Sequence, residues 1–599
     1  MDNATPIRLA ALRQTMQQRG IAACLIPSAD PHLSEYLPEH WQARTWLSGF
    51  TGSAGTLVVT ADHAGLWTDS RYFTQATQQL AGSGIELMRQ RLAHAPEHLD
   101  WLQQHLQPGQ TLAVAGDSLA LATARQLDGR LQGVGARLRT DLDLPGEIWR
   151  DRPALPGNPV VEHPLRYAIT SRADKLSRLR TAMRKLGASH HLISSLDDIA
   201  WLTNLRGSDV ECNPVFLGHL LVQAAGHATL FVGRGKLNDA LVVALAADGI
   251  RIADYATVTD ALGELTAEDS LLFDSGRVVV SVAAAIAPAA KTIQAANPTT
   301  LLKSRKSEAE LDHIREVMRR DGTALVRAFR RLEERLVAGM SQTELDVDTL
   351  LREERAAQAD FVGESFATIA GYQANGALPH YRATPEAHST LKPQGLLLVD
   401  SGGQYLGGTT DITRVLALGE TTAEQRRDAT LTMKGMIALS RARFPRGASG
   451  PQLDALARAP LWASGMDYGH GTGHGVGYFL NVHEGPHGIR PPVPGATLVP
   501  LEPGMITSIE PGLYKAGRHG IRHENLAVVV EADKTEFGEF YAFETLTLCP
   551  FDRRALEPDL LNPEERAWLD DYHATVRAAL SPLLEDADLA WLERHCAPL

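Results

Sequence analysis

The chain contains 599 residues, of which 44% are apolar and 22% are charged, and its formal net charge is −13. This composition excludes a mostly disordered chain, and at roughly 150 residues per domain the length predicts three or four domains. The acidic balance argues against a general nucleic-acid-binding surface and against an anionic-membrane surface.

The four cysteines are far apart and include no CxxC pair, so neither a disulfide framework nor a thiolate metal site is expected. The amino-terminal segment lacks a basic stretch followed by an apolar one, and no apolar run approaches the ~20 residues that span a bilayer. We therefore expect a cytoplasmic protein with no membrane or nucleic-acid partner.

An internal repeat occupies the first half of the chain. Residues 8–30 align without gaps on residues 175–197, and the segment WLSGFTGS at 46–53 resembles WLTNLRGS at 201–208. Because the matches continue beyond a single helix, they indicate a duplicated unit rather than two unrelated amphipathic helices. The repeat predicts two α/β domains with related folds.

Each copy of the repeat combines a helix pattern with a strand pattern. In the first copy, Leu9, Leu12 and Met16 have the i, i+3, i+7 spacing of one helical face. Gly20 suits the left-handed conformation that ends such a helix, and residues 22–26 then favour a buried strand.

Two linkers mark the predicted domain boundaries. The proline-rich stretch 143–165 interrupts regular structure, and the second linker covers 297–306. Directly after it, Ser307 and Glu310 have the spacing of a capping box that starts a helix. The predicted domains are an α/β domain over 1–158, its repeat over 159–305, and a third domain with a C-terminal extension over 306–599.

The third domain contains two carboxylates next to apolar runs. Residues 396–418 form two strand-like runs around a glycine-rich connection, and the runs contain Asp400 and Asp411. Burying two neighbouring carboxylates requires either protonation or a cation between them. The pattern alone leaves two readings open, a metal site and a pair of turn aspartates.

A glycine-rich segment with two imidazoles follows at 470–477, HGTGHGVG. It lacks both spacings of phosphate-binding loops, so metal ligation or substrate contact by His470 and His474 is favoured. The nearby segment 483–487, HEGPH, matches the HExxH pattern of zinc peptidases. That pattern functions only on a helix, and the Gly-Pro pair inside it opposes a helix, so we reject a zinc site of that type.

Two further carboxylates complete the candidate ligands. Glu510 ends an apolar run before Pro511, and Glu524 precedes the strand-like segment 527–530. A set of two aspartates, two glutamates and one histidine is hard and oxygen-rich. It suits Mn²⁺, Co²⁺, Fe²⁺ or Zn²⁺ in a two-metal site.

The order of these motifs, VDSG, TTDITR, HGTGHGVG, EPG and ENL, resembles that of the pita-bread metallopeptidases. The closest resemblance is to the three-domain aminopeptidase P (Xaa-Pro aminopeptidase) family, and it extends to GFTGSAGT, LWTDSRYF, ALPHY and FLNVHEGP. It implies a mixed α/β and α+β fold, in which two related creatinase-type α/β domains precede a pita-bread catalytic domain. Methionine aminopeptidase lacks a counterpart to the two front domains.

The resemblance implies a role for each metal ligand. Asp400 chelates one ion, Asp411 and Glu524 bridge two ions, and His474 and Glu510 complete the second site. The implied cofactor is a pair of divalent ions, with Mn²⁺ as the leading candidate and Co²⁺ or Zn²⁺ as alternatives.

The resemblance also implies the residues that act on a peptide. Four are catalytic candidates: His380, His470, His483 and Glu510. Six are substrate-binding candidates: His380, His470, His483, Tyr514, Arg522 and Arg71. The last of these lies in the first domain and would have to reach across a domain or subunit boundary.

One position departs from the family pattern, because His523 stands where an apolar residue is usual between Arg522 and Glu524. Strand alternation places Arg522 and Glu524 on one face and His523 on the other. We therefore expect His523 to point away from the metals and to be hydrogen-bonded behind the sheet.

The implied activity is that of an Xaa-Pro aminopeptidase. It is a metallo-aminopeptidase that uses a metal-bridged hydroxide to hydrolyse the bond before a proline at the second position of a peptide, and Glu510 passes the proton to the proline nitrogen. The resemblance also implies a homodimer. Three alternatives stay open: a prolidase that cleaves Xaa-Pro dipeptides, a metal-free pita-bread protein that binds peptides, and a creatinase-type hydrolase without metal.

Overall fold

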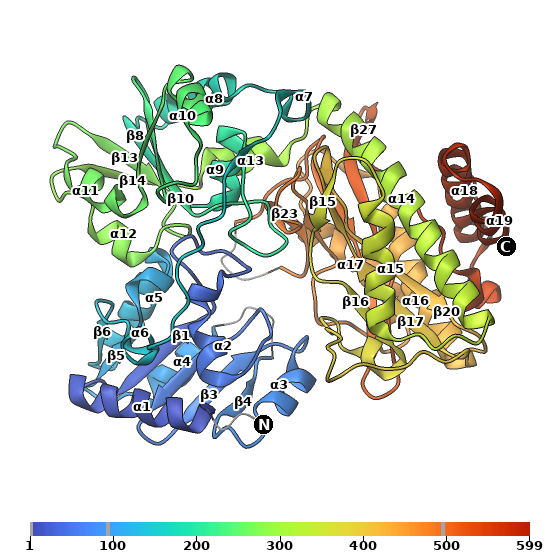
Figure 1. The fold of residues 1–599 in the computed structure, drawn as a ribbon, viewed down its shortest axis with the longest axis horizontal. Coiled ribbons are helices and arrows are strands. Elements are labelled where there is room, and N and C mark those ends of the chain that lie inside the picture. Colours follow the sequence, from blue (N-terminus) through green and yellow to red (C-terminus); the bar gives the residue numbers. More distant parts are fainter. Residues whose placement is uncertain (1–3, 92–95, 493–496) are drawn as a thin grey trace. The chain divides into compact units, whose positions relative to one another are not determined.

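The computed structural model describes residues 4–91, 96–492 and 497–599. The chain forms two compact units (Figure 1). The first comprises Met1–Leu165 and Thr170–Thr300, and the second comprises Arg166–Ile169 and Leu301–Leu599.

The first unit contains two six-stranded sheets of identical topology. Their strand orders are β4-β3-β2-β1-β5-β6 and β12-β11-β10-β8-β13-β14. In both, the first strand of the repeat is antiparallel to one neighbour and parallel to the other. The first sheet consists of β1 (Ala23–Pro27), β2 (Thr56–Thr60), β3 (Ala64–Thr68), β4 (Glu86–Arg89), β5 (Thr111–Ala113) and β6 (Arg137–Arg139). The second consists of β8 (His190–Ile193), β10 (Gly218–Gln223), β11 (Ala228–Val232), β12 (Ile250–Asp254), β13 (Ser270–Phe273) and β14 (Lys291–Gln294).

The helices of the two halves also correspond. α1 (Ala4–Arg19) and α8 (Arg172–Lys185) are each followed within two residues by a glycine with positive φ, and α2 (Ala43–Ser48) and α9 (Leu196–Thr203) each end at a left-handed residue. Together with the strand orders, these endings confirm the predicted duplication. Further helices of this unit include α3 (Phe73–Gln79), α4 (Glu97–His105), α5 (Leu121–Gln132), α10 (Asp239–Ala247), α11 (Val258–Gly263) and α12 (Val280–Ala284).

The predicted linkers contain more regular structure than their prolines suggested. The stretch 143–165 includes the short helix α6 (Leu144–Ile148), which begins with Asp143 accepting a hydrogen bond from the Gly146 N–H. Proline is compatible with the first turn of a helix, where its missing N–H has no partner in any case. The second linker contains α13 (Pro298–Ser304), and the units separate after Thr300. The three domain ranges themselves stay predictions.

The second unit begins with α14 (Glu308–Val337), and Ser307 and Glu310 form the predicted capping box at its start. Its other helices are α7 (Leu165–Ala168), α15 (Glu344–Ala356), α16 (Ala423–Ser440), α17 (Gly450–Trp462), α18 (Pro563–Leu580) and α19 (Asp586–His595). Figure 1 shows α14 and α15 side by side, and the α18–α19 pair at the carboxyl terminus. No helix of the described ranges combines the length and apolar character required to cross a membrane.

The sheets of this unit position the candidate ligands. The strand orders are β16-β17-β20, β15-β18-β19, β25-β26 and β21-β28-β27-β24-β22-β23. The strands are β15 (Phe361–Glu364), β16 (Ile369–Tyr372), β17 (Leu396–Ser401), β18 (Gly403–Tyr405), β19 (Gly408–Thr409), β20 (Ile412–Ala417), β21 (Phe444–Pro445), β22 (Gly473–Gly475), β23 (Glu484–Ile489), β24 (Ile506–Ile509), β25 (Gly512–Lys515), β26 (His519–Arg522), β27 (Asn525–Thr535) and β28 (Gly538–Thr545). A continuous apolar core joins the sheets β16-β17-β20, β25-β26 and β21-β28-β27-β24-β22-β23 to helices α14 to α19.

Two helices of that core approach each other at a glycine. A Cβ atom at Gly435 in α16 would lie 2.1 Å from the carbonyl oxygen of Ala457 in α17. This contact involves rigid backbone on both helices, so a side chain at position 435 would force them apart.

We predict that Gly435→Ala lowers the stability of the second unit by about 1–3 kcal/mol, since the clash outweighs the ~1 kcal/mol gain in helix propensity. The matched control is Gly129→Ala in α5, where a Cβ would meet nothing within 4 Å. Scanning calorimetry of both variants tests this. An unchanged unfolding transition in Gly435→Ala would show that the helices do not depend on this approach.

Candidate metal centre

Five predicted ligands come from separate strands of the second unit. Asp400 lies on β17 opposite Thr413 of β20, and Asp411 directly precedes β20. His474 lies on β22, Glu510 directly follows β24, and Glu524 lies between β26 and β27. Because β22 pairs with β24 and β24 pairs with β27, the ligand-bearing ends of these strands lie together.

The ligand atoms of these side chains converge. One atom each of Asp411, His474 and Glu524 lie within 4.8 Å of one another. The Nε2 atom of His474 is 3.5 Å from Asp411 Oδ2 and 3.5 Å from Glu510 Oε1. Asp400 joins the group through Arg522, which forms an ion pair with it and lies 3.9 Å from Glu510 Oε2. All five groups therefore border one small region.

Three of the four carboxylates, those of Asp400, Asp411 and Glu524, are buried, and two of them are incompletely hydrogen-bonded. Glu524 is 1% exposed and Asp400 is 8% exposed. Within the described residues, Asp400 Oδ1 and Glu524 Oε1 are buried oxygens without a hydrogen-bond partner. A buried, unpaired carboxylate oxygen is costly, and coordination of a cation is a common way to compensate it.

The electrostatics of the ion-free site favour protonation. Burial raises the pKa of Asp400 to about 6, even though Arg522 opposes this shift, and the negative charge of Asp411 adds to it. Burial and neighbouring carboxylates also raise the pKa values of Glu510 and Glu524. Burial alone would lower the pKa of His474, but its hydrogen bond with Asp411 and the charge of Glu510 raise it to about 9.

These observations fit divalent cations. Carboxylate oxygens with one imidazole are suitable ligands for first-row divalent ions, and such ions would neutralise the like charges that the fold buries together. The residues that would hold the ions are those predicted: Asp400, Asp411, His474, Glu510 and Glu524.

Two hydroxyl groups that the sequence analysis did not identify orient the ligands. Thr413 Oγ1 donates to Glu524 Oε2 at 2.8 Å, and Ser508 Oγ is 3.3 Å from Glu510 Oε1 and accepts from the His474 N–H at 2.9 Å. Thr413 follows Asp411 by two residues, so strand alternation within the motif TTDITR was the signal that could have identified it.

A chain of hydrogen bonds leads from Asp400 towards the glycine-rich segment. Arg522 binds Asp400 and donates from Nη1 to the Tyr514 hydroxyl at 2.6 Å. That hydroxyl lies 2.8 Å from His470 Nε2, while His470 Nδ1 lies 2.7 Å from the carbonyl oxygen of Gly471. Because Nδ1–H must donate to that carbonyl, Nε2 accepts from Tyr514. Burial raises the pKa of Tyr514 to about 12 against the effect of Arg522, so the phenol keeps its proton.

The other predicted substrate residues occupy different positions. His483 packs edge-on against His474, with ring centroids 4.3 Å apart. His380 follows Pro379, whose carbonyl oxygen lies 3.4 Å from Arg522 Nη2. Arg71 belongs to the first unit, where its guanidinium binds both oxygens of Asp69. A substrate contact by Arg71 stays a prediction.

His523 lies where strand alternation places it, away from the ligand group. It is 2% exposed, its Nε2 is 3.1 Å from the carbonyl oxygen of Ala429 in α16, and its ring meets Phe551 edge-on at 5.7 Å. Burial lowers its pKa to about 3, so it is neutral. The expectation of a hydrogen-bonded, non-ligating histidine is confirmed.

The rejection of a zinc-peptidase helix is also confirmed. In the HEGPH region, residues 484–489 form strand β23, which pairs with β22, and do not form a helix. His487 Nε2 contacts the Ile506 carbonyl oxygen at 2.8 Å, so this imidazole serves the sheet.

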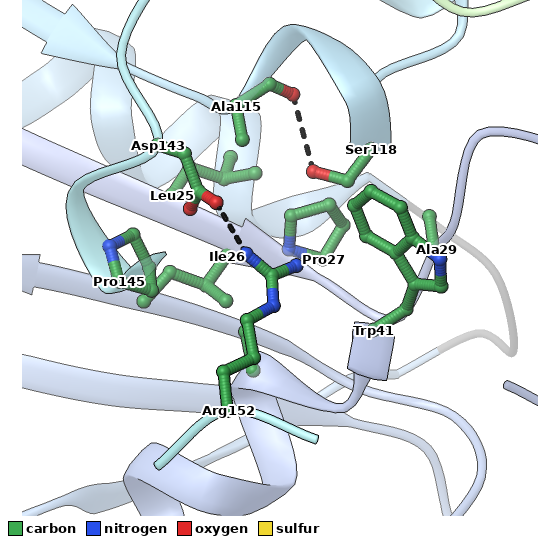
Figure 2. Close-up of a pocket in the computed structure, with 11 residues that line it drawn as sticks. Leu25, Ile26, Pro27, Ala29, Trp41, Ala115, Ser118, Asp143, Pro145 and Arg152 are labelled. Carbon is green, nitrogen blue, oxygen red and sulfur yellow. Dashed lines mark hydrogen bonds and ion pairs between the residues drawn. The ribbon is translucent and has the colours of Figure 1, made fainter. Parts of the chain in front are cut away.

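A pocket in the first unit is too small to be a substrate site. It lies at the carboxyl end of β1, where Leu25, Ile26 and Pro27 face the ion pair between Asp143 and Arg152 (Figure 2). Ligands of α/β sheets often bind at such strand ends. However, the cavity of about 20 Å³ has room for about one water molecule.

Comparison with known families agrees with the fold and the ligand cluster. The profile described as "Metallopeptidase family M24" matches residues 312–531, and "C-terminal region of peptidase_M24" matches 539–599. Profiles of the creatinase/prolidase N-terminal domain match 8–152 and 151–310. The chain belongs to the M24 metallopeptidases that carry creatinase-type N-terminal domains.

Individual relatives match over the full length. A probable Xaa-Pro aminopeptidase P of Laccaria bicolor is 39% identical, with 99% of this chain and 94% of the relative covered. A probable Xaa-Pro aminopeptidase P of Sordaria macrospora is 40% identical, with 99% of each covered. Among solved structures, an X-prolyl aminopeptidase of Caenorhabditis elegans, described as a cytosolic enzyme with a di-nuclear active site, has a TM-score of 0.93 and 31% identity over the whole of both chains.

The ion-free pKa values predict that metal binding releases protons. Coordination needs charged carboxylates and a neutral His474, but His474, with its pKa of about 9, holds a proton near neutrality, and burial raises the pKa of Glu524, which opposes its ionisation. The affinity for Mn²⁺ should therefore rise from about pH 6 to about pH 8. Titration calorimetry in buffers of different ionisation enthalpy measures both effects. A pH-independent affinity without proton release would contradict this electrostatic description.

Proposed function

We propose that this chain is an Xaa-Pro aminopeptidase, which hydrolyses the bond between the first residue of a peptide and a proline at the second position. The observation that carries the proposal is the convergence of four carboxylates and His474 in the second unit. The names of the full-length relatives support the substrate class.

We further propose that the site holds two divalent ions. When all four are ionised, Asp400, Asp411, Glu510 and Glu524 together carry four negative charges, which two divalent cations would balance. The di-nuclear site of the Caenorhabditis elegans enzyme supports this number. Mn²⁺ is the leading candidate because the ligands are rich in oxygen, with Co²⁺ and Zn²⁺ as alternatives. When bound, the ions would polarise the scissile carbonyl and lower the pKa of a water molecule.

The imidazoles are assigned to the substrate. We propose that His483, beside His474, donates a hydrogen bond to the carbonyl oxygen as negative charge develops on it. His470 and His380 are proposed to contact the proline side and the neighbouring backbone. The bond from Tyr514 fixes the tautomer and orientation of His470, and Arg522 holds Tyr514 in place.

Glu510 is proposed to move the proton. It would accept a proton from the attacking water and deliver it to the proline nitrogen as the C–N bond breaks. Its half-buried position between His474 and Arg522 limits its movement to this region. Proton delivery matters because the departing nitrogen of proline carries no hydrogen of its own in the peptide.

Assignments beyond the site rest on resemblance. We propose a homodimer and a cytoplasmic location, the latter supported by the description of the Caenorhabditis elegans enzyme as cytosolic. The domain ranges 1–158, 159–305 and 306–599, and a substrate contact by Arg71, belong to the same proposal. The filled ligand positions argue against the metal-free binding protein and against creatinase-type chemistry.

A peptide panel tests the substrate class and separates it from the prolidase alternative. With Mn²⁺ we expect cleavage of Xaa-Pro-Yaa tripeptides and at least about 100-fold lower kcat/KM for matched Xaa-Ala-Yaa peptides. Glu524→Gln, which keeps the shape of the side chain but removes its charge, should lose activity on all of them. Cleavage of Xaa-Pro dipeptides but not of tripeptides would identify a prolidase instead.

A further inference from the structure

A fully buried carboxylate outside the ligand cluster lies at the start of α15. Glu344 is 0% exposed, and its partners are neutral donors. Its Oε1 accepts from the Tyr372 N–H at 2.7 Å, and its Oε2 accepts from the Ser389 N–H at 2.6 Å and from the Tyr381 hydroxyl at 2.8 Å. Asn375 Nδ2 lies 3.0 and 3.1 Å from the two oxygens.

These donors belong to one loop, residues 372–389, which contains His380. Tyr372 is the last residue of β16, and Ser389 lies at the far end of the loop. The same Asn375 amide lies 3.1 Å from the Tyr381 hydroxyl and 3.0 Å from Ser389 Oγ. A single carboxylate therefore joins the two ends of the loop and the residue next to His380.

The other side of the loop meets the β25–β26 hairpin near the ligand cluster. Pro379 accepts from Arg522, the residue that binds Asp400. Gly376 approaches Gly520 so closely that a Cβ at position 520 would lie 1.6 Å from the Gly376 carbonyl oxygen. The backbone on both sides of His380 is thus fixed, by Arg522 before it and by Glu344 after it.

The hydrogen bonds to Glu344 require both of its side-chain oxygens to act as acceptors. A carboxylate accepts hydrogen bonds at both oxygens. The side-chain amide of glutamine has only one oxygen, and its NH₂ group would face a backbone N–H, which can donate but not accept. The N–H groups of Tyr372 and Ser389 bind different oxygens, so either orientation of a glutamine amide leaves one of them opposite a donor.

We propose that Glu344 is a positioning residue for His380, holding the loop 372–389 in the conformation in which that imidazole meets the peptide substrate. The inference rests on the proposed function, which assigns His380 to the substrate. No metal ligand is among the partners of Glu344, so its effect should reach substrate binding and leave ion binding unchanged.

The test compares Glu344→Gln with Asp346→Asn, a matched control in the first turn of the same helix. Asp346 accepts from the N–H and hydroxyl of Thr343, at 2.7 Å each, as part of the helix cap. For an Xaa-Pro-Yaa tripeptide we expect Glu344→Gln to raise KM about 10-fold with kcat changed less than about 3-fold, and to keep the wild-type metal content. Asp346→Asn should change both constants less than about 2-fold.

A double-mutant cycle with His380→Ala decides whether Glu344 acts through His380. We expect Glu344→Gln to add less than about 2-fold to KM in the His380→Ala background, since the imidazole it positions is gone. The proposal would be overturned if the effects of the two substitutions on KM multiply. It would also be overturned if Glu344→Gln behaves like Asp346→Asn, or if Glu344→Gln lowers the metal content. If Glu344→Gln does not fold, Tyr381→Phe replaces it. That change removes one donor and should raise KM about 3-fold in the same non-additive way.

The cycle separates this inference from the proposed function. Unchanged kinetics in His380→Ala would overturn the role of His380 and with it that of Glu344, while tripeptide cleavage by the wild-type enzyme would still support the peptidase. Failure of the wild-type enzyme to cleave Xaa-Pro-Yaa would overturn the proposed function itself.

Discussion

Mutual repulsion among three buried carboxylates and one half-buried carboxylate is the constraint on which the second unit depends. Asp400, Asp411, Glu510 and Glu524 surround one imidazole, and burial raises the pKa values of Asp400, Glu510 and Glu524. A fold that brings such groups together without a cation must protonate them or leave oxygens unpaired, as Asp400 Oδ1 and Glu524 Oε1 are. Divalent ions relieve both costs, and the M24 family assignment agrees with that conclusion.

The fold meets this constraint by placing each ligand on or beside a paired strand. Strand pairing fixes the backbone of β17, β20, β22, β24 and β27. The Thr413 hydroxyl holds the side chain of Glu524, and the buried guanidinium of Arg522 holds that of Asp400. Arg522 links Asp400 to Tyr514 and, through it, to His470. One connected set of hydrogen bonds therefore joins a proposed ion ligand, Asp400, to a proposed substrate contact, His470.

Much of this organisation was readable from local sequence. The helical face of Leu9, Leu12 and Met16 is buried as expected, and the repeat corresponds to two sheets of one topology. Capping boxes, strand alternation and helix-breaking pairs act within a few residues, so they predicted the start of α14 and the direction of His523. The family motifs contain the five residues that the fold brings close together, and their role as metal ligands stays a prediction.

Contacts between distant segments were not readable in the same way. Glu344 appears in the sequence as an ordinary first-turn glutamate, and its role depends on a loop that returns from residues 372–389. The helix α6 formed within a proline-rich stretch because its proline falls in the first turn. These features depend on which segments meet in three dimensions, and no short pattern records that.

The most direct test of the metal-centre account is anomalous diffraction from crystals grown with Mn²⁺. The account predicts two strong peaks among Asp400, Asp411, His474, Glu510 and Glu524, with Asp411 and Glu524 touching both ions. A single ion, or ions bound only elsewhere in the chain, would contradict it.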